Sequence, residues 1–331
     1  MAKLRVGILG CGGMAGGHAQ RLAKHEEVEL VALADVSEEG LNAFIERNLS
    51  DYQPRPAIFT DPVQMYAQAN LDAIVIVTPH TLHYEHAVQA LEAGCHILME
   101  KPMVTDSGQA HALAQKVEET GKVFVIGYNT PCTPVMAYIR DTIRSGELGN
   151  LELVSGWLAQ GWMKATTGTW RQNPALSGGG QMYDSGAHIF NSLVWTVEQP
   201  IEAVQAFIDN KGTPVDINGT ANIRFANGVL ATITIGGNCP AWGAKIVYLF
   251  ENGRIESDGW SAKWIKVWKD NEEVEVELDS STTSPVNNFV DAILGRDLPR
   301  TAPINGINQS ELMDAIYESA RTGQIAKPVK R

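Results

Sequence analysis

The stretch that decides the fold is Leu4-Arg5-Val6-Gly7-Ile8-Leu9-Gly10-Cys11-Gly12-Gly13-Met14-Ala15. An apolar run of strand length passes directly into a glycine-rich turn, and a second apolar run, residues 30–34, ends on Asp35. A strand, a glycine turn and an acidic residue about 20 positions further on form the sequence pattern of a dinucleotide-binding βαβ unit. The pattern therefore predicts a Rossmann-type sheet at the start of the chain.

The residues of the turn have separate tasks in this interpretation. Gly10 makes the tight turn, and Gly12 lets backbone N–H groups approach a pyrophosphate, while small Ala15 lets helix and strand pack closely. The residues expected to hold the phosphates are Gly10, Gly12, Gly13 and Met14.

The acidic residue predicts which cofactor is bound. The Asp35 carboxylate can hydrogen-bond both ribose hydroxyls, and it would repel the 2′-phosphate of NADP. The next two residues, Val36 and Ser37, carry no positive charge that could offset this repulsion. The sequence therefore predicts NAD rather than NADP.

Length and composition narrow the class of protein. A chain of 331 residues is long enough for two domains. Its formal net charge of −12, without a dense basic run, argues against nucleic acid or an anionic membrane as the main partner. The N-terminal segment has neither the apolar core of a signal peptide nor the roughly 20 apolar residues of a membrane span. The four cysteines show no C-x-x-C spacing, which is typical of reduced thiols in a cytoplasmic enzyme.

The first part of the chain alternates strand and helix patterns. Apolar strands are expected at residues 4–9, 29–34, 72–77, 95–99 and 122–127, with helices near 14–25, 37–47, 62–69, 81–93 and 106–120. Strands so continuously apolar suit a parallel sheet covered on both faces, and ligands of such doubly wound α/β sheets bind at the carboxyl ends of the strands. We expect residues 1–127 to form the dinucleotide-binding domain.

The rest of the chain changes to a two-residue alternation, clearest at residues 263–269 and 273–278. Asn227-Gly228 and Asn252-Gly253 are hairpin turn signals. Two late helices are expected near 284–295 and 308–322. Residues 128–331 are therefore predicted to form an α+β domain with a large, mostly antiparallel, open-faced sheet that binds substrate and supports oligomerisation.

Three further segments carry chemical groups. They are Thr78-Pro79-His80-Thr81-Leu82-His83, Glu100-Lys101-Pro102 and Ser177-Gly178-Gly179-Gly180-Gln181-Met182-Tyr183-Asp184-Ser185-Gly186-Ala187-His188. With the glycine turn, the Glu-Lys-Pro and the Gly-Gly-Gly…Asp-x-x-x-His in this order, the chain resembles the Gfo/Idh/MocA oxidoreductases over essentially its full length.

The resemblance implies hydride transfer between NAD and a hydroxyl-bearing carbon of a sugar, cyclitol or related polyol. It implies catalytic roles at the substrate for Lys101, Asp184 and His188. Trp162 and Arg171 precede the Gly-Gly-Gly segment and are expected to line the same substrate site, because indole faces stack on sugar C–H surfaces and a guanidinium binds hydroxyls or carboxylates. The residues it places at the cofactor are Gly10, Gly12, Gly13, Met14, Asp35, Thr78, Pro79, His83, Glu100, Lys101 and Asn129.

The residue types suit these roles. A lysine at a strand's carboxyl end, held between a cationic nicotinamide and a sugar, has its pKa lowered by both desolvation and charge. Asp184 and His188 are spaced i, i+4, so on a helix they share one face and the carboxylate can orient the imidazole. In the oxidative direction His188 would take the hydroxyl proton, and Lys101 would stabilise or relay charge on that oxygen.

Several positions depart from the family's usual pattern. Asn129-Thr130-Pro131-Cys132 stands where many members carry Asn-Arg-Arg-Phe, so the common arginine contacts are in doubt. His80 replaces a usual asparagine, and Asn191 replaces a frequent aspartate. A metal site at His80, His83 and His86 is not expected, because on a helix these side chains spread over about 120° without a clustered acid.

Two other functions remain open at this stage. Relatives with this fold include NAD-dependent glycoside hydrolases that oxidise the substrate transiently, and such enzymes show no net reduction of NAD. A sensor of sugars or dinucleotides that performs no chemistry is the other alternative, although such a protein has no need of a base.

The sequence of the late strands also predicts that copies of the chain associate with one another. Trp264, Ile265, Val267 and Trp268 fall on both faces of a strand, so one face would leave an apolar patch in a monomer. Pairing two such faces around a two-fold axis would cover it, which predicts a homodimer or homotetramer.

Overall fold

The computed structural model describes residues 2–279 and 282–329, so residues 1, 280, 281, 330 and 331 of the expected domains lie outside the described residues. The chain forms two compact units. Unit 1 contains the chain up to Val104, Gln109–Gly127 and Pro285–Pro303, and unit 2 contains Thr105–Gly108, Tyr128–Ser284 and the chain from Ile304. The units differ from an uninterrupted division at residue 127, because the chain returns to unit 1 at Pro285.

Unit 1 is built on a six-stranded parallel sheet in the order β3-β2-β1-β4-β5-β6. The strands are β1 (Leu4–Leu9), β2 (Val28–Ala34), β3 (Ala57–Phe59), β4 (Ala73–Ile76), β5 (His96–Met99) and β6 (Phe124–Ile126). The expected doubly wound sheet is confirmed. The short β3 was not predicted, since Ala57-Ile58-Phe59 is too brief to show a period.

The helices of this sheet are α1 (Ala15–Lys24), α2 (Glu38–Asn48), α3 (Pro62–Gln68), α4 (His83–Glu92) and α5 (Ser107–Thr120). Local sequence explains where two of them begin. The Ser37 side chain accepts the Gly40 N–H at the start of α2, and Asp61 accepts the Val63 N–H before Pro62 at the start of α3.

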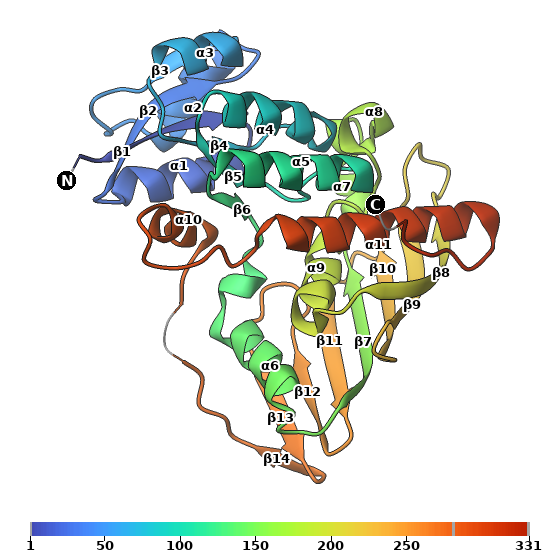
Figure 1. The fold of residues 1–331 in the computed structure, drawn as a ribbon. Helices are drawn as coiled ribbons and strands as arrows, with labels where there is room; N and C mark the ends of the chain where they lie inside the picture. Colours follow the sequence, from blue (N-terminus) through green and yellow to red (C-terminus); the bar gives the residue numbers. More distant parts are fainter. Residues whose placement is uncertain (1, 280–281, 330–331) are drawn as a thin grey trace. The chain divides into compact units, whose positions relative to one another are not determined.

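A late helix completes unit 1. Helix α10 (Pro285–Ile293) lies beside α1 and against β5 and β6 (Figure 1), and its Val286, Phe289 and Val290 are buried in the core of this unit. The Thr301 hydroxyl donates to the Ile126 carbonyl at 2.5 Å, and the Ile126 N–H donates back to the Thr301 carbonyl at 3.0 Å. These contacts are why residues 285–303 belong to the first unit, although the sequence placed them in the second.

Unit 2 is built on an eight-stranded sheet in the order β14-β13-β12-β11-β7-β10-β9-β8. The strands are β7 (Leu151–Ala159), β8 (Ile201–Asp209), β9 (Asn218–Phe225), β10 (Leu230–Gly236), β11 (Gly243–Phe250), β12 (Gly253–Ser257), β13 (Ile265–Lys269) and β14 (Glu272–Val274). Only β7 and β10 pair in parallel, so the large, mostly antiparallel sheet is confirmed. Both Asn-Gly turns connect antiparallel strands, as expected.

One face of this sheet is covered by helices. The long helices of unit 2 are α6 (Pro134–Ser145), α9 (Gly186–Val197) and α11 (Pro303–Thr322), and the short ones are α7 (Trp162–Ala165) and α8 (Pro174–Ser177). Helix α9 packs against β7, β10 and α6 (Figure 1), and nearly all of its side chains are buried. Helix α11 begins five residues earlier than predicted, because Pro303 starts it.

On the other face of this sheet, the apolar side chains differ in how far they are exposed. Of the apolar residues at 264–268, Val267 is fully buried and Ile265 is half-buried, whereas Trp264 is 40% exposed. Trp268 is covered by the Arg254 guanidinium, whose carbon lies 3.9 Å from the ring centroid. The large apolar side chains exposed within the strands are Leu153, Trp157, Phe207 and Leu230. Across the described ranges, no helix is both long and apolar enough to cross a membrane.

Candidate functional site

In unit 1, the predicted cofactor residues follow the carboxyl ends of neighbouring strands. Gly10 follows β1, Asp35 follows β2, Thr78 lies two residues beyond β4 and Glu100 follows β5. The strand ends are joined by backbone hydrogen bonds, among them Gly10 N–H to the Ala34 carbonyl at 2.8 Å. One edge of one sheet therefore carries all four, where doubly wound folds bind ligands.

The glycine turn has the form that a dinucleotide needs. Gly10 has φ +90°, and a Cβ there would lie 2.7 Å from the Val77 carbonyl carbon, so only glycine fits. At Gly12 and Gly13 a Cβ would meet no described atom within 4 Å, so this side of the turn is open. Helix α1 starts directly behind it, with its N-terminal N–H groups available to an anion. The turn fits a pyrophosphate.

Asp35 is oriented by backbone donors. The Cys11 N–H donates to its Oδ2 and the Val36 N–H to its Oδ1, both at 2.7 Å. Each oxygen keeps a second acceptor site for a ribose hydroxyl. Burial, followed by the charge of Asp35, raises the pKa of the Cys11 thiol to about 12, so this cysteine is held as an unreactive thiol.

Glu100 and Lys101 follow β5, and Glu100 is buried. The His18 Nε2 lies 2.7 Å from Glu100 Oε1, and Glu100 Oε2 accepts the Lys101 N–H at 3.2 Å. Burial by itself raises the pKa of Glu100, but the hydrogen bond and charge of His18, with the charge of Lys101, lower it to about 2. The carboxylate is therefore ionised at neutral pH. The Lys101–Pro102 peptide bond is cis.

His83, predicted at the cofactor, is completely buried at the start of α4. Its ring nitrogens lie 2.7 Å from the Pro102 carbonyl oxygen and 2.9 Å from the Thr78 carbonyl oxygen. His86 Nδ1 lies 2.9 Å from Thr78 Oγ1. Within the described part of the chain, no cluster of three or more metal-ligating side chains is present.

In unit 2, the glycine-rich segment before His188 is anchored by Asp216. Its buried carboxylate accepts the Gly180 N–H at 2.6 Å, the Met182 N–H at 2.7 Å and the Tyr317 hydroxyl. A Cβ on Gly180 would lie 2.0 Å from the Asp216 carbonyl oxygen, which explains the glycine. Burial raises the pKa of Asp216, and its three hydrogen-bond donors only partly oppose this.

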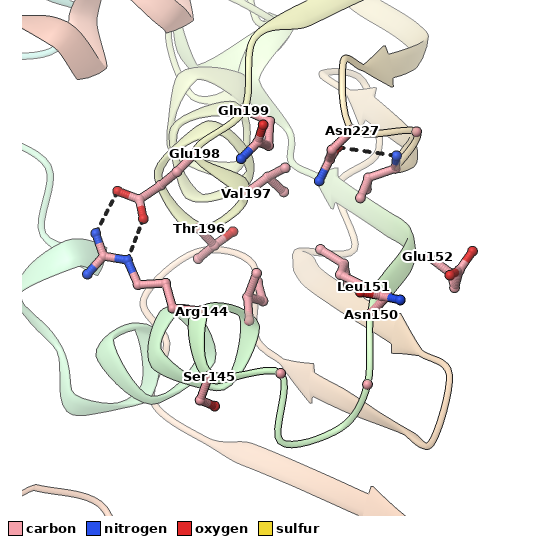
Figure 2. Close-up of a pocket in the computed structure, with 15 residues that line it drawn as sticks. Arg144, Ser145, Asn150, Leu151, Glu152, Thr196, Val197, Glu198, Gln199 and Asn227 are labelled. Carbon is pink, nitrogen blue, oxygen red and sulfur yellow. Dashed lines mark hydrogen bonds and ion pairs between the residues drawn. The ribbon is translucent and has the colours of Figure 1, made fainter.

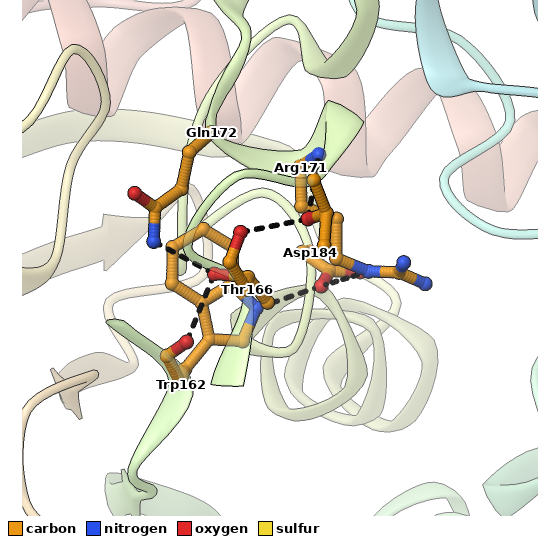
Figure 3. A network of polar contacts seen from close by, with 6 residues as sticks. Trp162, Thr166, Arg171, Gln172 and Asp184 are labelled. Atoms are coloured by element: carbon orange, nitrogen blue, oxygen red, sulfur yellow. Dashed lines mark hydrogen bonds and ion pairs between the residues drawn. The ribbon is translucent and has the colours of Figure 1, made fainter. Parts of the chain in front are cut away.

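Asp184 lies in the turn that this anchor creates. The prediction that Asp184 and His188 share one helix is wrong, because α9 begins only at Gly186. Asp184 Oδ2 accepts the Trp162 indole N–H at 2.8 Å and the Arg171 Nε–H at 3.0 Å. The carboxylate lies between the two side chains (Figure 3), so residues predicted to bind substrate are brought together with a predicted catalytic one.

Trp162 and Arg171 differ in exposure. Trp162 is buried behind Asp184, whereas the Arg171 side chain is 30% exposed and its guanidinium carbon lies 4.6 Å from the Trp170 ring centroid. In the same loop, the Gln172 side-chain amide donates to the Met163 carbonyl at 2.6 Å. It also donates to the Thr166 hydroxyl oxygen, as Figure 3 shows. The Arg171 guanidinium is therefore held by Asp184 and Trp170 and remains partly exposed.

His188 is half-buried in the first turn of α9. Its ring centroid lies 4.4 Å from that of Trp260 and 5.9 Å from that of Tyr128, which meets it edge-on. Trp260 is fixed by Asp258, which accepts the N–H groups of Trp260 and Ser261 at 3.1 and 2.6 Å. Asn129, predicted at the cofactor, is exposed beside Tyr128.

The sequence interpretation missed His18, Asp216, Trp260 and Tyr317. Only His18 left a signal, since it lies one helical turn beyond Met14 in the helix after the glycine turn. Asp216 and Trp260 are 32 and 72 residues from Asp184 and His188 in sequence and reach them only through the tertiary fold.

A separate hollow of about 690 Å³ lies in unit 2, where α6 and α9 end beside the β9–β10 turn. None of the predicted site residues lines it. Its most prominent charges neutralise each other, since Arg144 Nε lies 2.6 Å from Glu198 Oε2 (Figure 2). We therefore do not assign the chemistry to this hollow.

Comparisons with known proteins match both parts of the chain. Residues 4–128 match the model of an oxidoreductase family with an NAD-binding Rossmann fold, and residues 136–256 match the model of the Gfo/Idh/MocA C-terminal domain.

Curated relatives act on sugars and cyclitols. D-glucoside 3-dehydrogenase of Escherichia coli K12 is 28% identical over 210 residues, 61% of this chain and 57% of that protein. Inositol 2-dehydrogenase 4 of Saccharopolyspora erythraea is 26% identical over 242 residues, 72% of this chain and 68% of that protein. The match thus spans little more than half the length of the first relative.

Solved structures show the same fold. The WlbA dehydrogenase of Bordetella pertussis, in complex with NADH and UDP-GlcNAcA, has a TM-score of 0.85 at 24% identity and covers 99% of both chains. An oxidoreductase domain protein from Kribbella flavida has a TM-score of 0.87 at 20% identity and covers 100% of both chains.

Proposed function

The chain belongs to the Gfo/Idh/MocA family of NAD-binding oxidoreductases, and we propose that it is an NAD-dependent dehydrogenase of a sugar, cyclitol or related polyol. The observation that carries this proposal is the sheet edge of unit 1, where an open glycine turn, an oriented Asp35 and Lys101 follow β1, β2 and β5 at the carboxyl ends of one parallel sheet. Unit 1 would hold the cofactor, and unit 2 would hold the substrate and supply the base. The sugar and cyclitol dehydrogenases among the relatives support the substrate class.

The cofactor would be held by the residues of this edge. The backbone at Gly10, Gly12, Gly13 and Met14 would bind the pyrophosphate, and Asp35 the ribose hydroxyls. The remaining residues proposed near the cofactor are Thr78, Pro79, His83, Glu100, Lys101 and Asn129. When bound, NAD supplies the hydride acceptor for oxidation of the substrate carbon.

Each proposed catalytic residue has a task at the reacting hydroxyl. His188 takes the hydroxyl proton as the general base, and Asp184 orients and tunes it. Lys101 donates a hydrogen bond to the same oxygen and stabilises the charge that develops there. The Glu100 carboxylate, which is ionised at neutral pH, precedes Lys101 and accepts its backbone N–H.

The substrate would contact Arg171 directly, because a guanidinium donates to hydroxyl or carboxylate oxygens. Trp162 would act from behind Asp184, since its indole is buried and its N–H is already bound. The substrate set also includes Lys101, Asp184 and His188.

NAD preference follows from Asp35. Its carboxylate repels a 2′-phosphate, and the neighbouring Val36 side chain is exposed and uncharged. Dissociation constants for the two cofactors test this preference, and we expect tighter binding of NAD. Equal or tighter NADP binding would refute the assignment.

We further propose a cytoplasmic homodimer or homotetramer. Paired outer sheet faces would cover Leu153, Trp157, Phe207 and Leu230, which are exposed in the single chain. A reducing cytoplasm would keep exposed Cys239 as a thiol. Light scattering at micromolar concentration checks the assembly, and a monomer mass would contradict it.

A panel of sugars and cyclitols, assayed for NAD reduction at 340 nm, tests the activity itself. We expect substrate-dependent NADH formation with at least one member. Cleavage of a glycoside without added NAD and without net reduction would favour the hydrolase instead. Ligand binding without turnover of any panel member would favour a sensor.

A further inference from the structure

Lys101 lies between two residues that are each held by a buried histidine. On the N-terminal side, the His18 Nε2 lies 2.7 Å from Glu100 Oε1, and Glu100 Oε2 accepts the Lys101 N–H. His18 comes from α1, the helix that starts at the glycine turn. The phosphate-binding helix and the lysine loop are thereby joined through one side-chain pair.

On the C-terminal side, His83 Nδ1 lies 2.7 Å from the Pro102 carbonyl oxygen, and its Nε2 lies 2.9 Å from the Thr78 carbonyl oxygen. Carbonyl oxygens only accept hydrogen bonds, so a neutral imidazole donates to one of them at a time and an imidazolium to both. Burial lowers the pKa of His83, which favours the neutral form. This ring connects the lysine loop to the loop after β4.

Packing alone does not explain these groups. The exposed fractions of His18, His83 and Glu100 are 6%, 0% and 8%. Burial of polar and charged side chains is costly even when they are paired, and apolar residues of similar volume are often as stable or more stable. A sheet edge that needed only stability would therefore not require two histidines and a carboxylate around one lysine.

We propose that His18 and His83 are positioning residues that fix the backbone on both sides of Lys101. The two contacts hold residues 100 and 102, so the lysine side chain between them starts from a fixed backbone. Such fixation matters for chemistry, because a displacement of about 1 Å can cost on the order of 10²-fold in rate. The inference rests on the catalytic role proposed above for Lys101.

The test compares three substitutions of His18. A glutamine amide nitrogen reaches the position of Nε2, an asparagine amide nitrogen reaches only that of Nδ1, and leucine has no donor. We expect His18→Asn and His18→Leu to lower kcat, per NAD-binding site, by about ten- to a hundredfold. His18→Gln should stay within about threefold of the wild type, and the NAD dissociation constant should change little in all three.

Counting NAD-binding sites separates positioning from folding. A purely structural role would lower the number of competent sites and the melting temperature without changing kcat per site. Hydrogen exchange of a peptide spanning Lys101 gives a readout independent of turnover, and it should rise in His18→Asn but not in His18→Gln. His25→Gln, at the end of the same helix, serves as the control and should behave as wild type.

The outcomes are distinguishable. Equal kcat per site for His18→Gln and His18→Asn would overturn the inference, and so would a wild-type kcat in His18→Leu. If His18→Leu does not fold, the glutamine and asparagine pair decides. A wild-type protein that binds NAD but turns over no panel substrate would instead refute the proposed function, and the exchange data would still test the positioning.

His83, which contacts the residue after Lys101, provides a second test of the same proposal. His83→Leu removes both carbonyl contacts and should lower kcat per NAD-binding site by about tenfold or more. Unchanged kcat per site in this variant would show that the C-terminal side of the lysine needs no such support.

Discussion

Two buried carboxylates, Glu100 in unit 1 and Asp216 in unit 2, hold the loops that carry the proposed catalytic residues. The pKa values of the two carboxylates are shifted in opposite directions. Glu100 faces His18 and one backbone N–H, and its pKa is lowered to about 2. Asp216 faces two backbone N–H groups and the Tyr317 hydroxyl, and its pKa is raised because burial outweighs these donors. The hydrogen bond to His18 and the charge of Lys101 thus outweigh burial at Glu100, whereas the neutral donors at Asp216 do not.

The two reactive loops depend on these anchors in different ways. Glu100 is adjacent in sequence to the lysine that it positions. Asp216 is distant in sequence and fixes the backbone of Gly180 and Met182, so Asp184 and His188 follow from a turn rather than from a side-chain contact. We expect substitutions on the Glu100 side to change chemistry first, and those on the Asp216 side to change both stability and chemistry.

The largest effect is expected for Lys101→Ala, which removes the group that Glu100 positions. Turnover should be abolished while NAD affinity stays nearly intact, because the proposed pyrophosphate contacts come from the backbone around Gly10. Steady-state kinetics and an NAD titration measure both. If more than about a tenth of the wild-type kcat remained, less than roughly 1.4 kcal/mol would be lost, and the proposed role would be wrong.

The next largest effect is expected for His188, which follows the turn that Asp216 holds. Loss of general-base help in His188→Ala should slow oxidation by roughly 10²–10⁴-fold. If His188 is the base as proposed, oxidation requires its neutral form, so the wild-type kcat/KM should rise with pH through one ionisation. In Asp184→Asn the apparent pKa of this rise in kcat/KM should fall, because the charge that favours the imidazolium is gone. A pH profile unchanged in His188→Ala would show that the proton leaves through another group, such as Lys101.

Asp216→Asn tests the anchor itself. The asparagine amide would turn an N–H donor toward one of the N–H groups that the carboxylate now accepts, so we expect a loss of about 1–3 kcal/mol of stability. Tyr317→Phe is the matched variant, because it removes one donor and keeps the carboxylate, and it should cost less. Urea unfolding measures both. An Asp216→Asn variant as stable as wild type would mean that the turn does not need its anchor.

The smallest effect is a difference in acid response. The pKa of Glu100 is lowered from 4.5 to about 2, so the unfolded state binds more protons in this window and stability falls as the pH drops from about 4.5 to 2. The pKa of Asp216 is raised above 3.8, so its contribution has the opposite sign and is lost as the pH rises through the folded-state value.

Melting temperatures between pH 2 and 6 separate these two contributions. Glu100→Gln should flatten the acid limb, whereas Asp216→Asn should leave that limb in place and improve, relative to wild type, as the pH rises. The same acid limb in wild type and Glu100→Gln would contradict the ionised state assigned to Glu100.

Much of unit 1 could be predicted from the sequence because its signals are local. The strand from Leu4, the turn at Gly10 and the acid at Asp35 lie within one βαβ unit, and parallel strands buried on both faces are continuously apolar. Glu100 and Lys101 could be placed because they follow such a strand. The position of α10 could not, since an amphipathic helix shows which face is buried but not which sheet covers it.

Unit 2 shows where sequence reasoning ends. Two-residue alternation and two Asn-Gly turns determined a mostly antiparallel sheet, but not its strand order or the parallel pair of β7 and β10. The i, i+4 spacing of Asp184 and His188 suggested one helix. The structure begins α9 at Gly186 because Asp216, 36 residues beyond Gly180, bonds the backbone into a turn.

By itself, the sequence determined the dinucleotide-binding βαβ unit, the family and the identity of the chemical groups, because each is encoded by neighbouring residues. Only the tertiary structure decided what surrounds those groups: His18 beside Glu100, Trp162 and Arg171 on Asp184, and Trp260 against His188. The physical reason is that burial, hydrogen-bond partners and pKa shifts depend on atoms brought together from distant parts of the chain, and no local pattern records those contacts.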